Sequence, residues 1–248
     1  MWRNILAVLF LLEFVSTNAH AQAKNLLPAD FPARFASTKA TVQKDAAKTY
    51  AQECRGRQRH VFRRAREGWQ GYQRLLKDKN DEVVLAALGM NTCFKANKTL
   101  PLLADLSQHK SIKVMHEALT LMAHMENVAA VSTFIKWLKE KSELCGSTKQ
   151  SKLDLCHLAL YGLGQSSQHA APDASERILA GDVLKAFLTD AQPKTRKVAA
   201  MALALGGAAA HKKDLEALLQ NEKHNVFPQA NAPEDLQAIA QMMGQMSN

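Results

Sequence analysis

A nine-residue pattern that returns along the chain constrains the fold more than any other feature. Residues 113–121 (KVMHEALTL) align without a gap with residues 197–205 (KVAAMALAL), and both read K-V-x-x-x-A-L-x-L. We call the valine of this pattern, or the residue equivalent to it, the anchor of a copy. With two looser copies included, the anchors are Val83, Val114, Leu155 and Val198. The anchors are 31, 41 and 43 residues apart. Valine and alanine four positions apart, followed by leucine, place one apolar stripe on a helix. A repeat of this length indicates stacked units of supersecondary structure.

A second amphipathic stretch precedes each copy. These stretches are residues 72–78, 100–106, 131–144 and 178–188, and a final pair follows at 214–219 and 233–246. Proline and glycine lie in the gaps between stretches, where helices end. Aromatic residues make up only 6% of the chain, whereas strands draw heavily on aromatic and β-branched residues. The sequence therefore predicts an all-α fold built of helix pairs.

Residues 75–89 (LLKDKNDEVVLAALG) resemble the consensus of the HEAT-repeat family: a leucine-rich first helix, an acidic turn, then valine and an alanine-leucine-glycine ending. Residues 188–206 follow the same frame, and the resemblance extends over residues 70–246. It implies a right-handed α-α solenoid of about four to five HEAT-like helical pairs, each burying its apolar stripe against its neighbours. The 31-residue spacing and the connection at residues 165–173 depart from a regular stack and predict a bend or break near the middle.

The first residues have the features of a secretory signal peptide. Arg3 precedes eight apolar residues at 5–12, and two overlapping A-x-A cleavage signals follow at 19–21 and 21–23. The apolar run is too short to cross a bilayer, which takes about 20 residues. We therefore expect cleavage of residues 1–21 and a periplasmic or secreted protein that does not span the membrane.

The rest of the chain is predicted to form one domain behind a short lead-in. Residues 22–40 contain Pro28 and Pro32 and are expected to be extended. Residues 41–246 form a single HEAT-like domain in this prediction, with residues 41–66 as its N-terminal capping helix.

An exported chain with an even number of cysteines predicts disulfides. Cys145 and Cys156 flank a turn at Gly146 and are expected to staple it, which leaves Cys54 to pair with Cys93 by elimination. Four cysteines allow three pairings. A single unbroken hairpin, however, would place Cys54 and Cys93 at different heights.

The net charge of +9 is concentrated near the start of the expected mature chain. Six arginines and no acidic residue lie between residues 55 and 66, and on a helix four of them form one stripe: Arg55, Arg59, Arg63 and Arg66. This stripe is either a solvated helix face or a docking surface for anionic groups, since guanidinium binds phosphate and carboxylate in a bidentate manner. Nucleic acid is not favoured, because the exposed aromatic residues that stack on bases are missing from the stripe.

Repeat alignment gives a second candidate surface. Histidines lie two residues past the anchor in consecutive copies, Thr120 and Tyr161 lie six past it, and lysines precede it in two copies. In HEAT-like proteins this side of the second helix lines the concave surface. The candidate partner-binding ladder is Lys113, His116, Thr120, His157, Tyr161 and Lys197. The alternative is that these are ordinary solvent-facing residues.

No motif of a hydrolase, a metalloprotease or a nucleotide-binding loop occurs, so we expect neither an enzyme nor a cofactor. The expected function is a non-catalytic scaffold or adaptor that binds another protein of the cell envelope. An alternative is a binder of anionic lipid or polymer through the arginine stripe. A third is copper(I) handling by the methionines and histidines of residues 115–125, although these methionines follow the core stripe.

Overall fold

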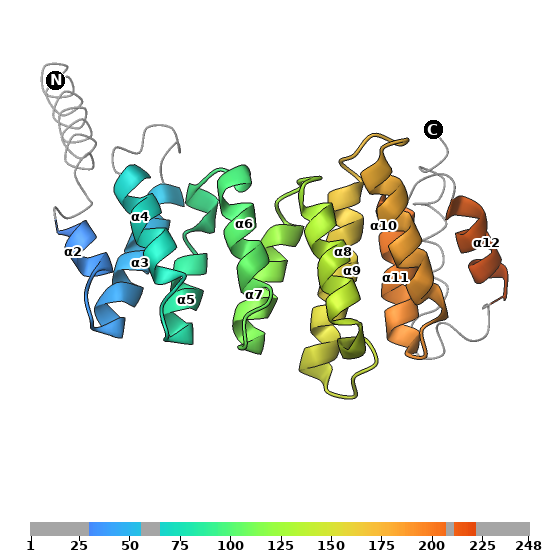
Figure 1. Cartoon of the computed structure of the whole chain (residues 1–248), viewed down its shortest axis with the longest axis horizontal. Coiled ribbons are helices and arrows are strands. Elements are labelled where there is room, and N and C mark those ends of the chain that lie inside the picture. Colours follow the sequence, from blue (N-terminus) through green and yellow to red (C-terminus); the bar gives the residue numbers. More distant parts are fainter. Residues whose placement is uncertain (1–29, 56–64, 207–210, 222–248) are drawn as a thin grey trace, which may run out of the picture. The chain divides into compact units, whose positions relative to one another are not determined.

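The structure, a computed structural model, describes residues 30–55, 65–206 and 211–221 (Figure 1). These residues form helices joined by short connections, and no strand occurs among them, which confirms the all-α prediction. None of the helices in these ranges is long and apolar enough to cross a membrane. The expected signal peptide, residues 1–21, lies outside the described ranges. The chain divides into two compact units, Met1–Phe94 and Lys95–Asn248, and each is considered by itself.

Unit 1 contains helices α2 (Phe31–Phe35), α3 (Ala40–Arg55), α4 (Ala65–Leu75) and α5 (Asp81–Leu88) and the 3₁₀ turn η3 (Asn91–Cys93). α3 contacts α2, α4, α5 and η3, and α4 contacts α2 and α5. The prediction of an extended lead-in is wrong over α2. Pro32 lies in the first turn of that helix, where proline is tolerated because the missing N–H would have no intrahelical acceptor.

Aromatic side chains fill the interior of unit 1. We call Phe31, Phe35, Tyr50, Trp69, Tyr72 and Phe94 the aromatic core. Phe94 links its members, with its ring centroid 5.0 Å from that of Tyr72 and 5.1 Å from that of Trp69. Burial raises the pKa of Tyr72, so its hydroxyl stays protonated and donates to Asn91 Oδ1 at 3.2 Å.

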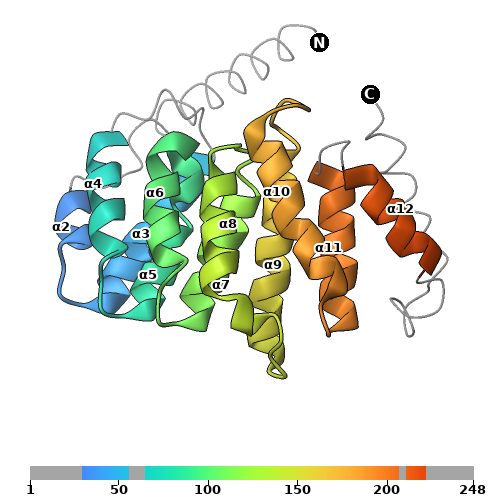
Figure 2. The ribbon, with the colours of Figure 1, turned by 45° about the vertical axis from the view of Figure 1, so that its right-hand side comes forward.

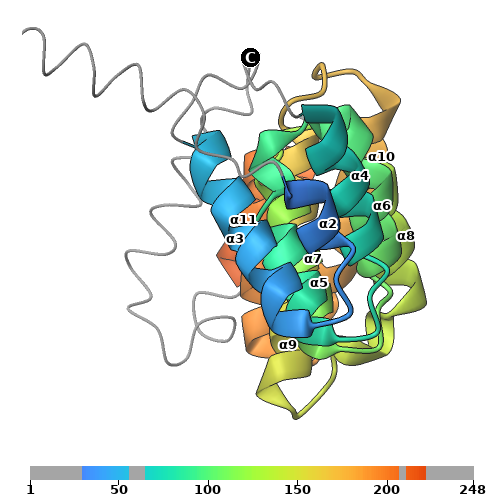
Figure 3. The same ribbon diagram turned by 90° about the vertical axis from the view of Figure 1, so that its left-hand side faces the viewer.

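Unit 2 contains a longer series of helices. They are α6 (Ala96–Leu106), α7 (Ile112–Ala123), α8 (Ala130–Glu140), α9 (Gln150–Ser167), α10 (Ser175–Ala186), α11 (Pro193–Gly206) and α12 (Lys212–Asn221), with 3₁₀ turns η4 (Ser142–Leu144) and η5 (Phe187–Thr189). α9 lies between α7 and α11, and α8 contacts α10. Figure 3 shows the resulting two layers of unit 2, with α7, α9 and α11 on one side and α6, α8 and α10 on the other.

Small residues bring α9 and α11 close together. A Cβ added at Gly164 would lie 2.6 Å from the Ala202 carbonyl oxygen, and one added at Gly206 would lie 2.0 Å from the Gly164 carbonyl oxygen. The Ser167 hydroxyl reaches Gly206 O at 2.9 Å across the same contact. The alanines four residues past the anchors of this unit are fully or almost fully buried, as the repeat pattern predicts: Ala118, Ala159 and Ala202.

Candidate functional site

Each helix of the α7/α9/α11 layer of unit 2 leaves a stripe of side chains accessible to solvent. α9 is the clearest case, because α7, α8, α10 and α11 all contact it. Its accessible side chains on this side are spaced as a single helical stripe: Asp154, Leu158, Tyr161 and Gln165. α7 contributes Lys113, His116, Glu117 and Thr120, and α11 contributes Lys194, Lys197, Val198, Met201 and Leu205. We call these three stripes together the ladder face.

Five of the six residues of the predicted ladder are accessible to solvent. Lys113, His116 and Tyr161 are exposed, and Thr120 and Lys197 are half-buried. The Thr120 hydroxyl donates to the His116 carbonyl oxygen at 2.8 Å, a bond within α7. The Tyr161 hydroxyl accepts from Gln165 Nε2 at 2.6 Å. The ring of Tyr161 is therefore held on the surface of α9 by a neighbour one turn along the helix.

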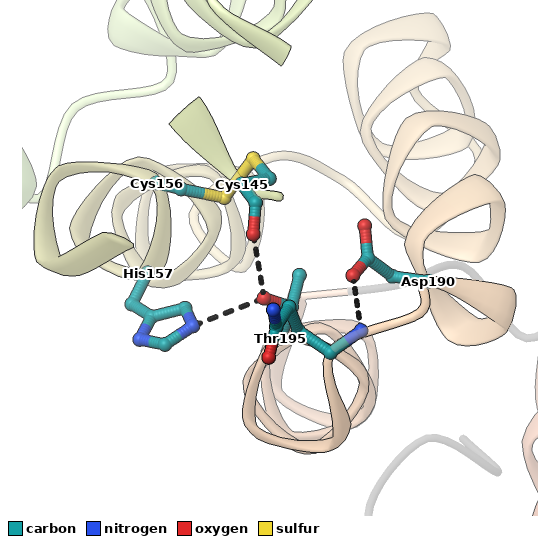
Figure 4. The surroundings of a disulfide bond; sticks show 6 residues. Cys145, Cys156, His157, Asp190 and Thr195 are labelled. Atoms are coloured by element: carbon teal, nitrogen blue, oxygen red, sulfur yellow. Dashed lines mark hydrogen bonds between the residues drawn. A yellow bond between two sulfur atoms is a disulfide. The ribbon is translucent and has the colours of Figure 1, made fainter. Parts of the chain in front are cut away.

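His157 is the exception, and its placement on the ladder is wrong. The residue is buried, and its Nε2 lies 3.1 Å from Thr195 Oγ1 of α11 (Figure 4). Thr195 in turn donates to the Cys145 carbonyl oxygen at 3.5 Å. The start of α11 and the segment carrying Cys145 thus cover the side of α9 that corresponds to the exposed His116 side of α7.

The surroundings of His157 favour the neutral imidazole. Burial lowers its pKa, and the positive charge of Lys194 adds to this effect, while Asp154 and Asp190 act in the opposite direction. Because the Thr195 hydroxyl donates to the Cys145 carbonyl oxygen, its own oxygen accepts a hydrogen bond from the Nε2–H of His157. The arrangement is a buried hydrogen-bonded chain that joins α9, α11 and the Cys145 segment.

The Cys145–Cys156 disulfide holds that segment in place. Its sulfur atoms are 2.02 Å apart and its Cα atoms 5.1 Å apart, so the predicted staple is confirmed. Cys156 directly precedes His157 on α9. The disulfide and the His157–Thr195 hydrogen bond therefore hold two consecutive residues of α9.

Two exposed apolar side chains lie on the ladder face. The described residues contain four large exposed apolar side chains, and two of them, Tyr161 at 40% and Met201 at 36%, lie on this face. They belong to the adjacent helices α9 and α11. The sequence interpretation missed Met201, although it stands three residues past Val198, the same repeat position as Leu158 past Leu155.

The arginine stripe belongs to unit 1 and is described only at its two ends. Arg55 is the last residue of α3 and Arg66 lies in the first turn of α4, and both are exposed. Arg59 and Arg63 lie outside the described residues, as does the middle of the expected capping helix. Whether the four arginines share one face is therefore still a prediction.

The second disulfide, Cys54–Cys93, is also confirmed, with Cα atoms 5.7 Å apart. The expected difference in height does not arise, because α5 ends at Leu88 and the chain then turns through η3, which carries Cys93 back toward the end of α3. The bond joins residues 39 positions apart and fastens α3 to η3 beside the aromatic core.

The methionines of the copper alternative are core residues. Met122 is fully buried and Met115 nearly so, Met125 is half-buried, and His116 and His124 are exposed. Within the described ranges no group of three or more His, Cys, Asp or Glu residues is arranged to hold a metal ion.

Comparison with known proteins supports the fold. No protein-family model matches the sequence, and no curated protein matches it. A crystal structure of an engineered protein from the Northeast Structural Genomics Consortium is similar, with a TM-score of 0.55. The match covers 88% of this chain and 98% of that one at 18% sequence identity, and it therefore concerns the fold alone.

Proposed function

We propose that this chain is an exported HEAT-like helical-repeat protein that binds a partner protein through its ladder face without catalysing a reaction. In this proposal α6/α7, α8/α9 and α10/α11 are consecutive repeat pairs of a right-handed solenoid, α4/α5 is an earlier pair, and α3 is the capping helix. The buried alanines of the repeat pattern support the pairs. The two disulfides support an oxidising compartment, such as the periplasm or the cell exterior.

The observation that carries the proposed function is the pair of exposed side chains Tyr161 and Met201 on adjacent helices. Tyrosine is enriched among the residues that dominate binding energy, and methionine adapts its shape to different partners. Both rest on a rigid base, because His157, Thr195 and the Cys145–Cys156 disulfide fasten the helices beneath them.

Charge on the ladder face indicates the chemistry of the partner. The α11 stripe carries Lys194 and Lys197 and no acidic residue, whereas the α7 and α9 stripes also carry Glu117 and Asp154. A segment with apolar side chains for Tyr161 and Met201 and acidic residues facing α11 fits this arrangement.

The buried histidine supports a structural function rather than catalysis. His157 and Thr195 are the pair that most resembles a base and a nucleophile, but Thr195 has no exposed surface. A hydroxyl that no substrate reaches cannot attack one, so we assign the pair to the support of the ladder face.

The proposed function is tested by recovering the partner from the native envelope and measuring its affinity by calorimetry. We expect Tyr161→Ala combined with Met201→Ala to weaken binding at least about tenfold, because both exposed apolar side chains are lost. The matched control is Ile178→Ala on α10, a side chain of similar exposure that lies off the ladder face, and it should leave the affinity unchanged. Equal affinities for all three proteins would refute the assignment of this face.

Anion binding by the arginine stripe is the second candidate, supported by the exposure of Arg55 and Arg66. Binding to vesicles of anionic lipid would then fall steeply as salt rises from about 0.05 to about 0.5 M. Arg55→Ala combined with Arg66→Ala would reduce that binding, whereas Tyr161→Ala would not. Vesicle binding that ignores both salt and the arginine changes would eliminate this candidate.

A further inference from the structure

A groove opens between α8 and α10, on the layer of unit 2 opposite to the ladder face. Figure 2 shows these two helices next to each other. Its volume is about 390 Å³, and it is lined by Val131, Ser132, Ile135, Lys136, Lys139, Glu140, Glu176 and Leu179. Leu179 is 55% exposed and is the most exposed of the large apolar side chains in the described residues. The same face therefore carries an apolar groove and an exposed leucine that could enter such a groove on another molecule.

The two walls of the groove differ in charge. On the α8 wall, Glu140 lies 3.9 Å from Lys136 and also accepts from Gln108 at 3.1 Å, so its charge is engaged within the unit. Lys139 lies on the same wall, and Glu176 lies on the α10 wall. Among the residues that the structure describes, neither Lys139 nor Glu176 forms an ion pair, although the two line one groove. The groove thus offers one positive and one negative site across an apolar floor.

We propose that a second copy of this chain occupies the groove, so that the protein forms a two-fold dimer through its α8/α10 faces. In such a dimer each contact occurs twice, with the roles of the copies exchanged. Leu179 of each copy enters the groove of the other, and Lys139 of each copy faces Glu176 of its partner copy. The α8 wall carries Lys139, and the α10 wall carries Glu176 and Leu179. The groove is therefore complementary to the same groove of a second copy.

The dimer goes beyond the proposed function and does not depend on it. The α8/α10 face and the ladder face lie on opposite layers of unit 2, so dimerisation leaves both ladder faces free. Two ladder faces in one assembly would raise the avidity for a partner that presents more than one copy of its binding segment.

The first test is sedimentation velocity on the purified protein from about 1 to about 200 μM. We expect a reversible dimer whose fraction rises with concentration, and a dissociation constant at least about tenfold larger for Leu179→Asp, which places a charge in the apolar groove. Met201→Asp is the matched control, since Met201 is an exposed apolar residue of the ladder face, and its dimer should match the wild type. A monomer at every concentration would overturn the proposal.

The second test exchanges the charges and distinguishes this dimer from any other. Lys139→Glu alone and Glu176→Lys alone each set like charges against each other twice, so each should weaken the dimer about three- to tenfold. Mixing the two single variants should restore wild-type affinity in the heterodimer, and K139E/E176K in one chain should restore the homodimer. Both residues are exposed, so the fold tolerates these changes. A dimer that Leu179→Asp and both charge changes leave intact would show that the copies meet elsewhere.

Discussion

The two units of the molecule solve the packing of short helices in different ways. Unit 1 places six aromatic rings between its helices, whereas the described part of unit 2 packs mainly alanine, leucine and methionine. In both units glycine gives room to an aromatic ring: Gly68 and Gly71 to those of Tyr50 and Phe35, and Gly162 of unit 2 to that of Phe134. Unit 2 differs because its Gly164 and Gly206 also give room to the backbone of the facing helix. A side chain is able to turn away from an intruding methyl group, and a backbone is not.

The disulfides reinforce this difference. The Cys54–Cys93 bond of unit 1 closes a loop between residues 39 positions apart, whereas the Cys145–Cys156 bond of unit 2 spans 11 positions. A longer loop restricts the unfolded chain more. Unit 1 therefore depends more on its disulfide, and unit 2 more on the close approach of its helices.

Removing each disulfide gives the largest expected effects. Replacing Cys54 and Cys93 by alanine should lower the free energy of unfolding of unit 1 by about 4 kcal/mol, and replacing Cys145 and Cys156 should lower that of unit 2 by about 3 kcal/mol. Native-state hydrogen exchange read separately for the two units measures both losses. A larger loss in unit 2 than in unit 1 would reverse the comparison.

Substitution of a packing glycine in unit 2 comes next. In Gly164→Ala the new methyl group would meet the Ala202 backbone, and we expect the free energy of unfolding to fall by about 2–3 kcal/mol. Gly146→Ala is the matched control, because no atom lies within 4 Å of a Cβ added there, and it should change stability by less than about 0.5 kcal/mol. Chemical denaturation compares the two, and equal stabilities would contradict the close helix approach.

The sequence predicted what depends on local periodicity. The helices, the buried Ala118, Ala159 and Ala202, and the Cys145–Cys156 pair follow from spacing along the chain, whereas Cys54–Cys93 was predicted only by elimination. Unit 2, where the repeat is clearest, was accordingly the better predicted of the two.

Features that depend on contacts between distant segments were not predicted. The aromatic core joins α2, α3, α4 and Phe94, none of which carries a repeat signal that points to the others. His157 has the same repeat position as His116, and only the proximity of Thr195, 38 residues away, decides that it is buried. Nor does the pattern reveal which accessible stripe carries an exposed methionine.

Removing the Tyr72 hydroxyl from the aromatic core of unit 1 is expected to lower its stability moderately. Tyr72→Phe keeps the ring and removes only the hydroxyl that donates to Asn91, so stability should fall by about 1 kcal/mol. Because Tyr72 belongs to unit 1, hydrogen exchange in unit 2 should not change. A loss above about 3 kcal/mol, measured by chemical denaturation, would mean that the polar contact and not ring packing dominates this core.

The smallest expected effect concerns the pH dependence of unit 2. Burial and the positive charge of Lys194 lower the pKa of His157. Below about pH 6.5 this histidine therefore takes up a proton more readily in the unfolded chain than in the folded chain. Stability of the wild type should therefore fall as the pH decreases through that range. His157→Gln keeps a donor for Thr195 but does not titrate; it should cost less than about 1 kcal/mol at neutral pH and remove this part of the acid sensitivity.

His116 provides the control for that measurement, because it occupies the same repeat position on α7 and is exposed. His116→Gln is the matched substitution at an exposed site, and its pH profile of unfolding is measured beside that of His157→Gln. If His157→Gln and His116→Gln gave the same profile between about pH 7.5 and 5.5, burial against Thr195 would have no influence on titration. The two substitutions thus compare a buried and an exposed histidine at the same repeat position. They test whether the contact between α9 and α11 shields His157 from solvent.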